Sequence, residues 1–374
     1  MSRLPRIGIS ALGLGILIAA LAPARGEDAP PPPSTGRTPP SPVSEPIYPH
    51  RTVKRVEIGS GARSYWLFEP ADPKPERAPV VVFNHGWFAV NPGVYGAWIE
   101  HLVRSGRIVI FPRYQNDVAT KPVEFLDNAL AAIRDAFVVL ETSPKHVKPD
   151  RSRFALVGHS AGGNLAAQLA AVAVDHGLPE PRAVLAMMPG EVQPVPGVSL
   201  ARIPASTLLV VVAGEDDVVV GDLRPRDIFV QAASIPSARK KYVLFRTDLH
   251  GTPRLVADHL APTGYERSFD SGDGVLRGFQ TNQAEINALD RFGFWRVTDI
   301  TLEAGFRGLT LDEATRKGDL FRHIGYWTDG RQVVPPVVGD DLTTIPRIYP
   351  TNGIKLFRWP MGRVAAAPAQ TVRN

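Results

Sequence analysis

Short apolar runs alternate with helical segments through the middle of the chain, and this alternation constrains the fold more than any other feature. Strands that are apolar at every position are buried on both faces, which is typical of a parallel sheet covered by helices. The expected strands are a pair at residues 53–58 and 65–68, followed by residues 79–83, 107–111, 154–157, 183–187, 208–213 and 242–245. The expected helices are residues 95–104, 125–140, 164–174 and 227–233. The pattern predicts an α/β fold with a mostly parallel central sheet and helices on both faces.

The N-terminus has a different character. Arg3 and Arg6 precede an uncharged, largely apolar stretch over residues 7–24, and small residues follow before Glu27. This pattern is typical of a cleaved secretory signal peptide, here residues 1–26, and predicts a secreted or periplasmic protein. The alternative is an uncleaved membrane anchor at residues 7–24, because about 17 apolar residues just span a bilayer. Either reading allows membrane or envelope association through the N-terminus.

The remainder of the chain divides into three further parts. Residues 27–50 are rich in proline without apolar periodicity, which predicts a disordered linker. Residues 51–298 carry the strand and helix pattern and form the expected main domain. Residues 299–374 keep many apolar and aromatic side chains, so we expect a C-terminal accessory extension that packs on that domain.

Composition excludes several classes of function. The chain has no cysteine, which rules out disulfides, thiolate metal sites and a cysteine nucleophile. The formal net charge is +5, from 42 basic and 37 acidic residues, and three of the arginines lie in the expected signal peptide. There is no dense run of Lys and Arg, so no nucleic-acid partner is expected.

A Gly-His-Ser-Ala-Gly sequence at residues 158–162 lies directly between an expected strand and an expected helix. In this context the glycines permit a sharp turn that exposes the hydroxyl of Ser160 at the end of the strand. The start of the following helix places backbone N–H groups, such as that of Ala161, beside a developing oxyanion. Ser160 is therefore the candidate nucleophile, and the alternative is that it only caps the helix.

A serine nucleophile needs a histidine base, which in this kind of fold comes last in the chain, after the acid. His250 follows the expected strand 242–245 through a short loop and is the predicted base. His259 is the alternative, and His323 is a weaker candidate.

The acid is expected just after an earlier strand. Residues 213–218 follow a buried strand and contain three consecutive carboxylates. Like charges cannot all be buried together, so one carboxylate is expected to hold the histidine. Asp217 is the predicted acid, with Asp216 second and Glu191, after the preceding strand, as a third possibility.

The end of strand 79–83 leads into Asn84-His85-Gly86-Trp87. The Trp87 N–H is the expected second oxyanion donor, with Ala161 as its partner, whereas His85 is expected to stabilise the loop. The nearby aromatic residues either line an acyl pocket or pack helix against sheet, namely Trp87, Phe88, Tyr95 and Trp98.

These motifs carry a family resemblance over about residues 51–295. The pattern VVVFNHGW, HLVRSGRIVIFPRY and FALVGHSAGGNLA resembles the α/β-hydrolase superfamily, and within it the chlorophyllase and platelet-activating-factor acetylhydrolase-like esterases and cutinase-type polyester hydrolases. The resemblance implies an α/β-hydrolase fold, a serine triad, no cofactor and carboxylic-ester substrates. Carried over to this sequence, it supports Ser160, Asp217 and His250, with oxyanion donors at Trp87 and Ala161.

The sequence thus predicts an exported serine hydrolase that cleaves small-molecule or polymeric esters through an acyl-enzyme. An acyltransferase or a peptidase of the same fold is an alternative, as is a non-catalytic binding protein of the envelope.

Residues 270–274 resemble a calcium loop but lack the downstream glutamate, so we expect an ordinary turn and no metal.

Overall fold

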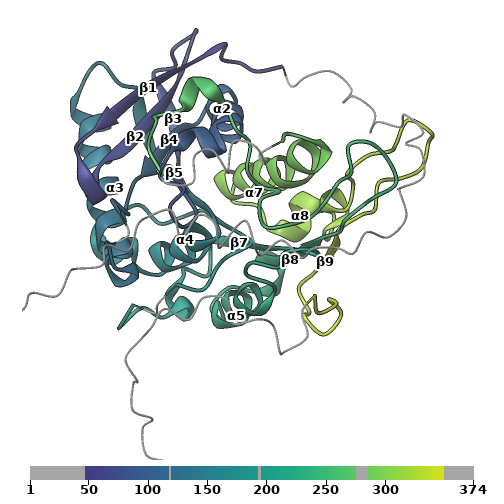
Figure 1. The fold of residues 1–374 in the computed structure, drawn as a ribbon. Coiled ribbons are helices and arrows are strands. Elements are labelled where there is room, and N and C mark those ends of the chain that lie inside the picture. Colours follow the sequence, from purple (N-terminus) through teal and green to yellow (C-terminus); the bar gives the residue numbers. More distant parts are fainter. Residues whose placement is uncertain (1–46, 118, 193–194, 275–284, 349–374) are drawn as a thin grey trace, which may run out of the picture.

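The structure is a computed structural model that describes residues 47–117, 119–192, 195–274 and 285–348. The expected signal peptide at residues 1–26 lies outside these residues. The described chain builds a nine-stranded sheet in the order β1-β2-β4-β3-β5-β6-β7-β8-β9 (Figure 1). The strands are β1 (Thr52–Ile58), β2 (Tyr65–Ala71), β3 (Arg77–Asn84), β4 (Ile108–Pro112), β5 (Lys148–His159), β6 (Ala183–Met187), β7 (Leu208–Gly214), β8 (Lys240–Phe245) and β9 (Val337–Gly339).

The centre of the sheet is parallel. Strands β4, β3, β5, β6, β7 and β8 all pair in parallel, whereas β1, β2 and β9 pair antiparallel at the two edges. The parallel strands contain the apolar runs of the sequence, and the residues of these runs are buried, apart from the half-buried Pro79. Strands that are apolar on both faces need helices on both sides, which confirms the predicted α/β fold.

The helices cover the two faces in separate groups. Helices α3, α4 and α5 pack on one face, and α2, α7 and α8 pack on the other (Figure 1). The α-helices are α2 (Gly96–Arg104), α3 (Phe125–Thr142), α4 (Ala161–Val172), α5 (Leu223–Gln231), α7 (Trp295–Phe306) and α8 (Leu311–Thr315). Shorter 3-10 turns are η1 (Gly61–Arg63), η2 (Pro92–Tyr95), η3 (Pro122–Glu124), η4 (Val174–His176), η5 (Leu200–Arg202), η6 (Ser237–Arg239), η7 (Arg267–Phe269) and η9 (Asp319–Phe321), and η8 (Leu289–Phe294) is a π-helix.

The C-terminal part of the described chain is built into this architecture. The expected domain boundary at residues 298/299 falls inside α7, and β9 extends the sheet beside β8. The guanidinium of Arg226, on α5, donates to the carbonyl oxygens of Leu342, Ile345 and Pro346. Residues 299–348 therefore share the sheet and the cores of the main domain.

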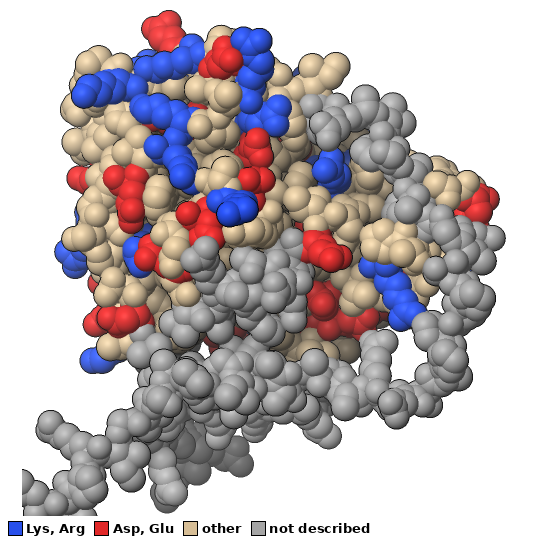
Figure 2. All heavy atoms as spheres, turned by 45° about the horizontal axis from the view of Figure 1, so that its top comes forward, with Lys and Arg blue, Asp and Glu red and all other residues tan. Residues whose placement is uncertain are grey.

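The face of the molecule drawn in Figure 2 carries charges of both signs, and the basic and acidic side chains of its described residues are interspersed. No helix within the described ranges is both long enough and apolar enough to span a bilayer.

Candidate active site

Ser160 occupies a strained turn between β5 and α4. Its backbone has φ 55° and ψ −126°, a conformation that L-residues rarely adopt, and its N–H donates to the carbonyl of Met187 at 3.0 Å. Helix α4 begins at Ala161, directly after the turn, rather than at Asn164 as the sequence suggested. The turn lifts the Ser160 side chain beyond the end of the sheet, where it is partly exposed.

Two glycines make this turn possible. A Cβ on Gly158 would lie 2.0 Å from the carbonyl oxygen of Gly162. A Cβ on Gly162 would lie 2.1 Å from the carbonyl oxygen of Asn84 and 2.3 Å from that of His85. All three distances are far below a van der Waals contact with backbone, so the close packing of α4 against β5 and β3 requires glycine.

His259 connects Ser160 to Asp217. Its Nε2 lies 2.9 Å from the Ser160 Oγ, and its Nδ1 lies 2.8 Å from the Asp217 Oδ2. The histidine side chain is 9% exposed and the aspartate side chain is fully buried. The three side chains come from the turn after β5, the loop after β7 and the loop after β8, all at the carboxyl end of the parallel sheet.

Asp217 is held in a fixed orientation. Its Oδ1 accepts the backbone N–H groups of Val219 and Val220, each at 3.0 Å, and its Oδ2 faces His259. The carboxylate has no exposed surface, and these hydrogen bonds offset the free-energy cost of removing its charge from water.

The alternative acids lie elsewhere. The Asp216 Oδ2 accepts the hydroxyl of Thr247 at 2.6 Å. The carboxylate of Glu215 pairs with Arg246. Glu191 is exposed and interacts electrostatically with Arg224. None of these carboxylates has a hydrogen bond to His259 among the described residues.

The structure does not bring His250, the predicted base, to Ser160, and it places the alternative, His259, there instead. Its Nε2 bonds to Asp329 at 2.9 Å and its Nδ1 accepts from Arg331 at 3.0 Å, so its ring faces the C-terminal segment. The chain after β8 first makes a small antiparallel bridge between Asp248 and Leu255, with His250 at its tip. After this bridge the chain returns to the carboxyl end of the parallel strands, where His259 lies beside Ser160. His323 also lies apart, with its ring against Tyr326.

The expected oxyanion donors belong to the two segments that adjoin Ser160. Among the described residues, the backbone N–H groups of Ala161 and Trp87 have no hydrogen-bond partner. A Cβ on Gly190 would lie 3.4 Å from both the Ser160 Oγ and the Ala161 nitrogen, and a Cβ on Gly86 would lie 3.3 Å from the Ser160 Cβ. Glycine at these two positions keeps the space beside Ser160 open. The role of Gly190 was not predicted, because an isolated glycine after a strand carries no specific signal.

His85 lies beneath this loop and is completely buried. Its Nδ1 is 2.6 Å from the carbonyl of Gly86, its Nε2 is 2.7 Å from that of Arg113, and its ring stacks on Tyr114. Burial lowers the pKa of His85 to about 4, although the two carbonyls act in the opposite direction. A neutral ring donates to one carbonyl, which places His85 among the groups that fix the loop.

The aromatic residues separate into two groups. Trp98 and Tyr95 are buried in the core against Phe83 and offer no surface to a ligand. Trp87 and Phe88 are partly exposed beside the site. The chain after Asp217 exposes apolar side chains, with Val218 at 44% and Val219 at 51% in the loop and Leu223 at 57% at the start of α5.

No group of three potential metal ligands occurs within the described ranges. In the turn at residues 270–274, the Asp270 carboxylate accepts from Asn91, Tyr265 and the N–H of Gly272.

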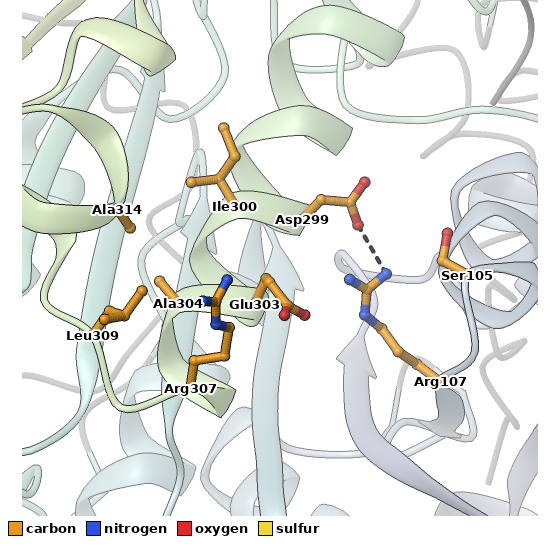
Figure 3. A pocket seen from close by; sticks show the side chains of 9 residues that line it. All are labelled: Ser105, Arg107, Asp299, Ile300, Glu303, Ala304, Arg307, Leu309 and Ala314. Atoms are coloured by element: carbon orange, nitrogen blue, oxygen red, sulfur yellow. Dashed lines mark hydrogen bonds and ion pairs between the residues drawn. The ribbon is translucent and has the colours of Figure 1, made fainter. Parts of the chain in front are cut away.

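A depression of about 500 Å³ lies between α7 and the start of β4, at the amino end of the parallel strands and therefore away from Ser160 at their carboxyl end. Figure 3 shows Arg107 reaching across it to Asp299, at 2.9 Å.

Comparison with known proteins agrees with the fold. Residues 81–219, which include Ser160 and Asp217, match a family described as having the alpha/beta hydrolase fold. The chain is also similar to the non-reducing polyketide synthase ausA of Aspergillus calidoustus, with 27% identity over 167 residues. That match covers 41% of this chain and 7% of the fungal protein, so the chain spans only a small part of that relative's length. The sheet, the turn at Ser160 and the family match agree on an α/β-hydrolase fold, which supports a hydrolase-type function.

Proposed function

We propose that the protein is a serine hydrolase of carboxylic esters, with Ser160 as nucleophile, His259 as base and Asp217 as the orienting acid. The observation that carries the proposal is the position of His259, which bonds to Ser160 at 2.9 Å and to Asp217 at 2.8 Å. These distances suit direct proton transfer between nucleophile and base.

The direction of each hydrogen bond follows from the carboxylate. Asp217 only accepts, so the Nδ1–H of His259 donates to it, and the Nε2 of His259 accepts the hydroxyl proton of Ser160. The Ser160 oxygen attacks the ester carbonyl while its proton moves to His259. Asp217 stabilises the resulting imidazolium, and the N–H groups of Ala161 and Trp87 stabilise the oxyanion.

The collapse of this intermediate completes the first half-reaction. His259 gives its proton to the leaving alcohol, and the acyl group stays on Ser160. Water then attacks the acyl-enzyme with His259 again as base, and the acid is released.

The surroundings of the triad support substrates with an apolar portion. Val218, Val219 and Leu223, which follow Asp217 in the chain, are about half exposed, and Trp87 and Phe88, in the loop after β3, are partly exposed. Apolar side chains at the rim of a site gain free energy by covering an apolar acyl chain or polymer segment. The signal-peptide pattern of residues 1–26 supports the further proposal that hydrolysis takes place outside the cytoplasm.

The test is hydrolysis of p-nitrophenyl esters from C2 to C16 by the wild type and by Ser160→Ala. We expect turnover by the wild type, a loss of at least ~10³-fold in the variant, and an optimum above C2. A fluorophosphonate should label the wild type and not the variant. Absence of both turnover and labelling would overturn the proposal in favour of a non-catalytic binding protein of the same fold.

A further inference from the structure

A chain of three buried hydrogen bonds connects the oxyanion loop to the loop that carries His259. The N–H of Gly86 donates to the Tyr95 hydroxyl at 2.9 Å, and that hydroxyl lies 2.9 Å from the Nδ1 of His159. The Nε2 of His159 lies 2.8 Å from the carbonyl oxygen of His259. Tyr95 and His159 are 1% and 2% exposed, so water does not replace these bonds.

Chemistry determines the direction of every bond in this chain. The Gly86 N–H is only a donor, so the Tyr95 oxygen accepts it and the Tyr95 O–H donates to the Nδ1 of His159. The proton of the His159 ring is then on Nε2, from which it donates to the carbonyl of His259. All three bonds are satisfied only when His159 is neutral. Burial, followed by the charge of His259, lowers the pKa of His159 well below its usual range, which favours this neutral form.

This chain fixes a residue whose loop has no regular secondary structure. His259 lies in the segment after β8, outside any helix or strand. The Asp258 carboxylate accepts the N–H groups of Leu260 and Ala261, which rigidifies the turn itself. The bond from His159 attaches that turn to the residue next to Ser160, and the rings of His159 and His259 pack with centroids 4.8 Å apart.

We propose that Tyr95 and His159 are positioning residues that hold the base, the nucleophile and the oxyanion loop in one fixed arrangement. His159 precedes the nucleophile, contacts the base through its main chain, and reaches the oxyanion loop through Tyr95. A displacement of either loop therefore moves the base relative to the oxyanion donors. This inference rests on the proposed function of Ser160 and His259.

The test compares variants that break the chain with one that rebuilds it. Tyr95→Phe keeps the ring in place but removes the bonds to Gly86 and to His159. His159→Leu removes the donor to His259, whereas His159→Gln retains one acceptor and one donor. Misalignment of reacting groups by about 1 Å costs on the order of 100-fold in rate, so we expect kcat to fall about 10- to 100-fold in Tyr95→Phe and His159→Leu. We expect KM to change by less than about threefold and His159→Gln to recover most of the loss.

Tyr65→Phe is the matched control. Tyr65 is also 1% exposed and its hydroxyl donates to Asp135 at 2.6 Å, at a site on β2 away from Ser160. We expect its kcat to stay within about twofold of the wild type. A purely structural effect would lower kcat in all four variants in proportion to the loss of folded protein, measured by near-UV circular dichroism, and would overturn the inference. Unchanged kcat in Tyr95→Phe and His159→Leu would overturn it as well.

The wild type and Ser160→Ala are measured in the same assay. If the wild type turns over esters and Ser160→Ala does not, a negative result with the Tyr95 and His159 variants refutes the positioning role alone. If the wild type neither turns over esters nor reacts with the fluorophosphonate, the proposed function fails and the positioning role fails with it.

Discussion

Replacement of Asp217 by asparagine is the most specific test of the triad, because the surroundings of the side chain dictate how the new amide must sit. The two N–H groups of Val219 and Val220 both point at the Oδ1 of Asp217, from 3.0 Å. An amide NH₂ group at the Oδ1 position would itself be a donor, so the N–H groups of Val219 and Val220 would both lose their acceptor. The amide oxygen of the asparagine must therefore take the Oδ1 position, and its NH₂ must face the Nδ1 of His259.

This orientation reverses the tautomer of the base. An NH₂ group only donates, so the Nδ1 of His259 must accept and its proton moves to Nε2. The Nε2 lies 2.9 Å from the Ser160 Oγ and, once protonated, no longer accepts the hydroxyl proton. Loss of the correct tautomer in a serine triad costs about 10⁴-fold in kcat, which corresponds to about 5 kcal/mol of activation free energy.

The assay is saturation kinetics with p-nitrophenyl butyrate, with folding checked by circular dichroism. Asp216→Asn is the matched control, because the Asp216 carboxylate accepts the Thr247 hydroxyl and has no bond to His259 in the described chain. We expect its kcat within about threefold of the wild type. The reasoning fails if Asp217→Asn keeps more than about a tenth of the wild-type kcat, or if Asp216→Asn loses as much.

Three further predictions concern the neighbouring residues. His259→Ala should lower kcat/KM by at least ~10³-fold in ester hydrolysis, whereas His250→Ala should leave it within about threefold, and equal losses would refute the assignment of the base. Gly162→Ala should lower the free energy of unfolding by more than about 3 kcal/mol, because the alanine Cβ would lie 2.1 Å from the carbonyl oxygen of Asn84. Urea denaturation measures this change, and an unfolding midpoint equal to that of the wild type would contradict it. Burial lowers the pKa of His85 to about 4, below the value of about 6.5 in the unfolded chain. The free energy of unfolding is therefore highest above pH ~6.5 and should fall by about 3 kcal/mol as the pH decreases toward 4. Burial also lowers the pKa of His159, so protonation of this ring at low pH should destabilise the fold in the same way. Urea denaturation at pH 7.5 and at pH 5 should show a lower free energy of unfolding at pH 5. Histidine NMR should show both rings titrating below the usual pKa, and titration of either ring near pH 6.5 would contradict the prediction.

Local patterns in the sequence were sufficient for the parallel strands of the sheet and for the turn at Ser160. An apolar run specifies a buried strand, and the Gly-x-Ser-x-Gly turn is defined by neighbouring residues whose geometry depends little on the remainder of the chain. Ser160 directly follows the end of β5 and Asp217 is the third residue after the end of β7, so their convergence at the carboxyl end of the sheet follows from the parallel order of β5, β6 and β7.

The histidine could not be chosen in the same way. His250 follows β8 more closely, and a short loop after the strand was the natural assumption. The outcome depends instead on the bridge between Asp248 and Leu255 and on contacts with Asp329 and Arg331, which are remote in sequence. No local pattern reveals a contact of this kind. The buried chain through Tyr95 was equally invisible, because a tyrosine near an oxyanion loop is compatible with simple packing.

The same remote contacts show why the C-terminal segment matters to the site. The Asp248 Oδ2 accepts the indole N–H of Trp327 and the backbone N–H of Val334, both at 2.9 Å, while its Oδ1 accepts the N–H of His250. Burial alone would raise the pKa of Asp248, but these bonds outweigh it and lower the pKa, so the buried carboxylate is held as an anion. It therefore attaches the loop after β8 to a segment that β9 in turn fixes to the sheet. The return of the chain from Leu255 to His259 starts from this anchored bridge. The C-terminal segment consequently helps to place His259, although none of its described residues bonds to Ser160, Asp217 or His259.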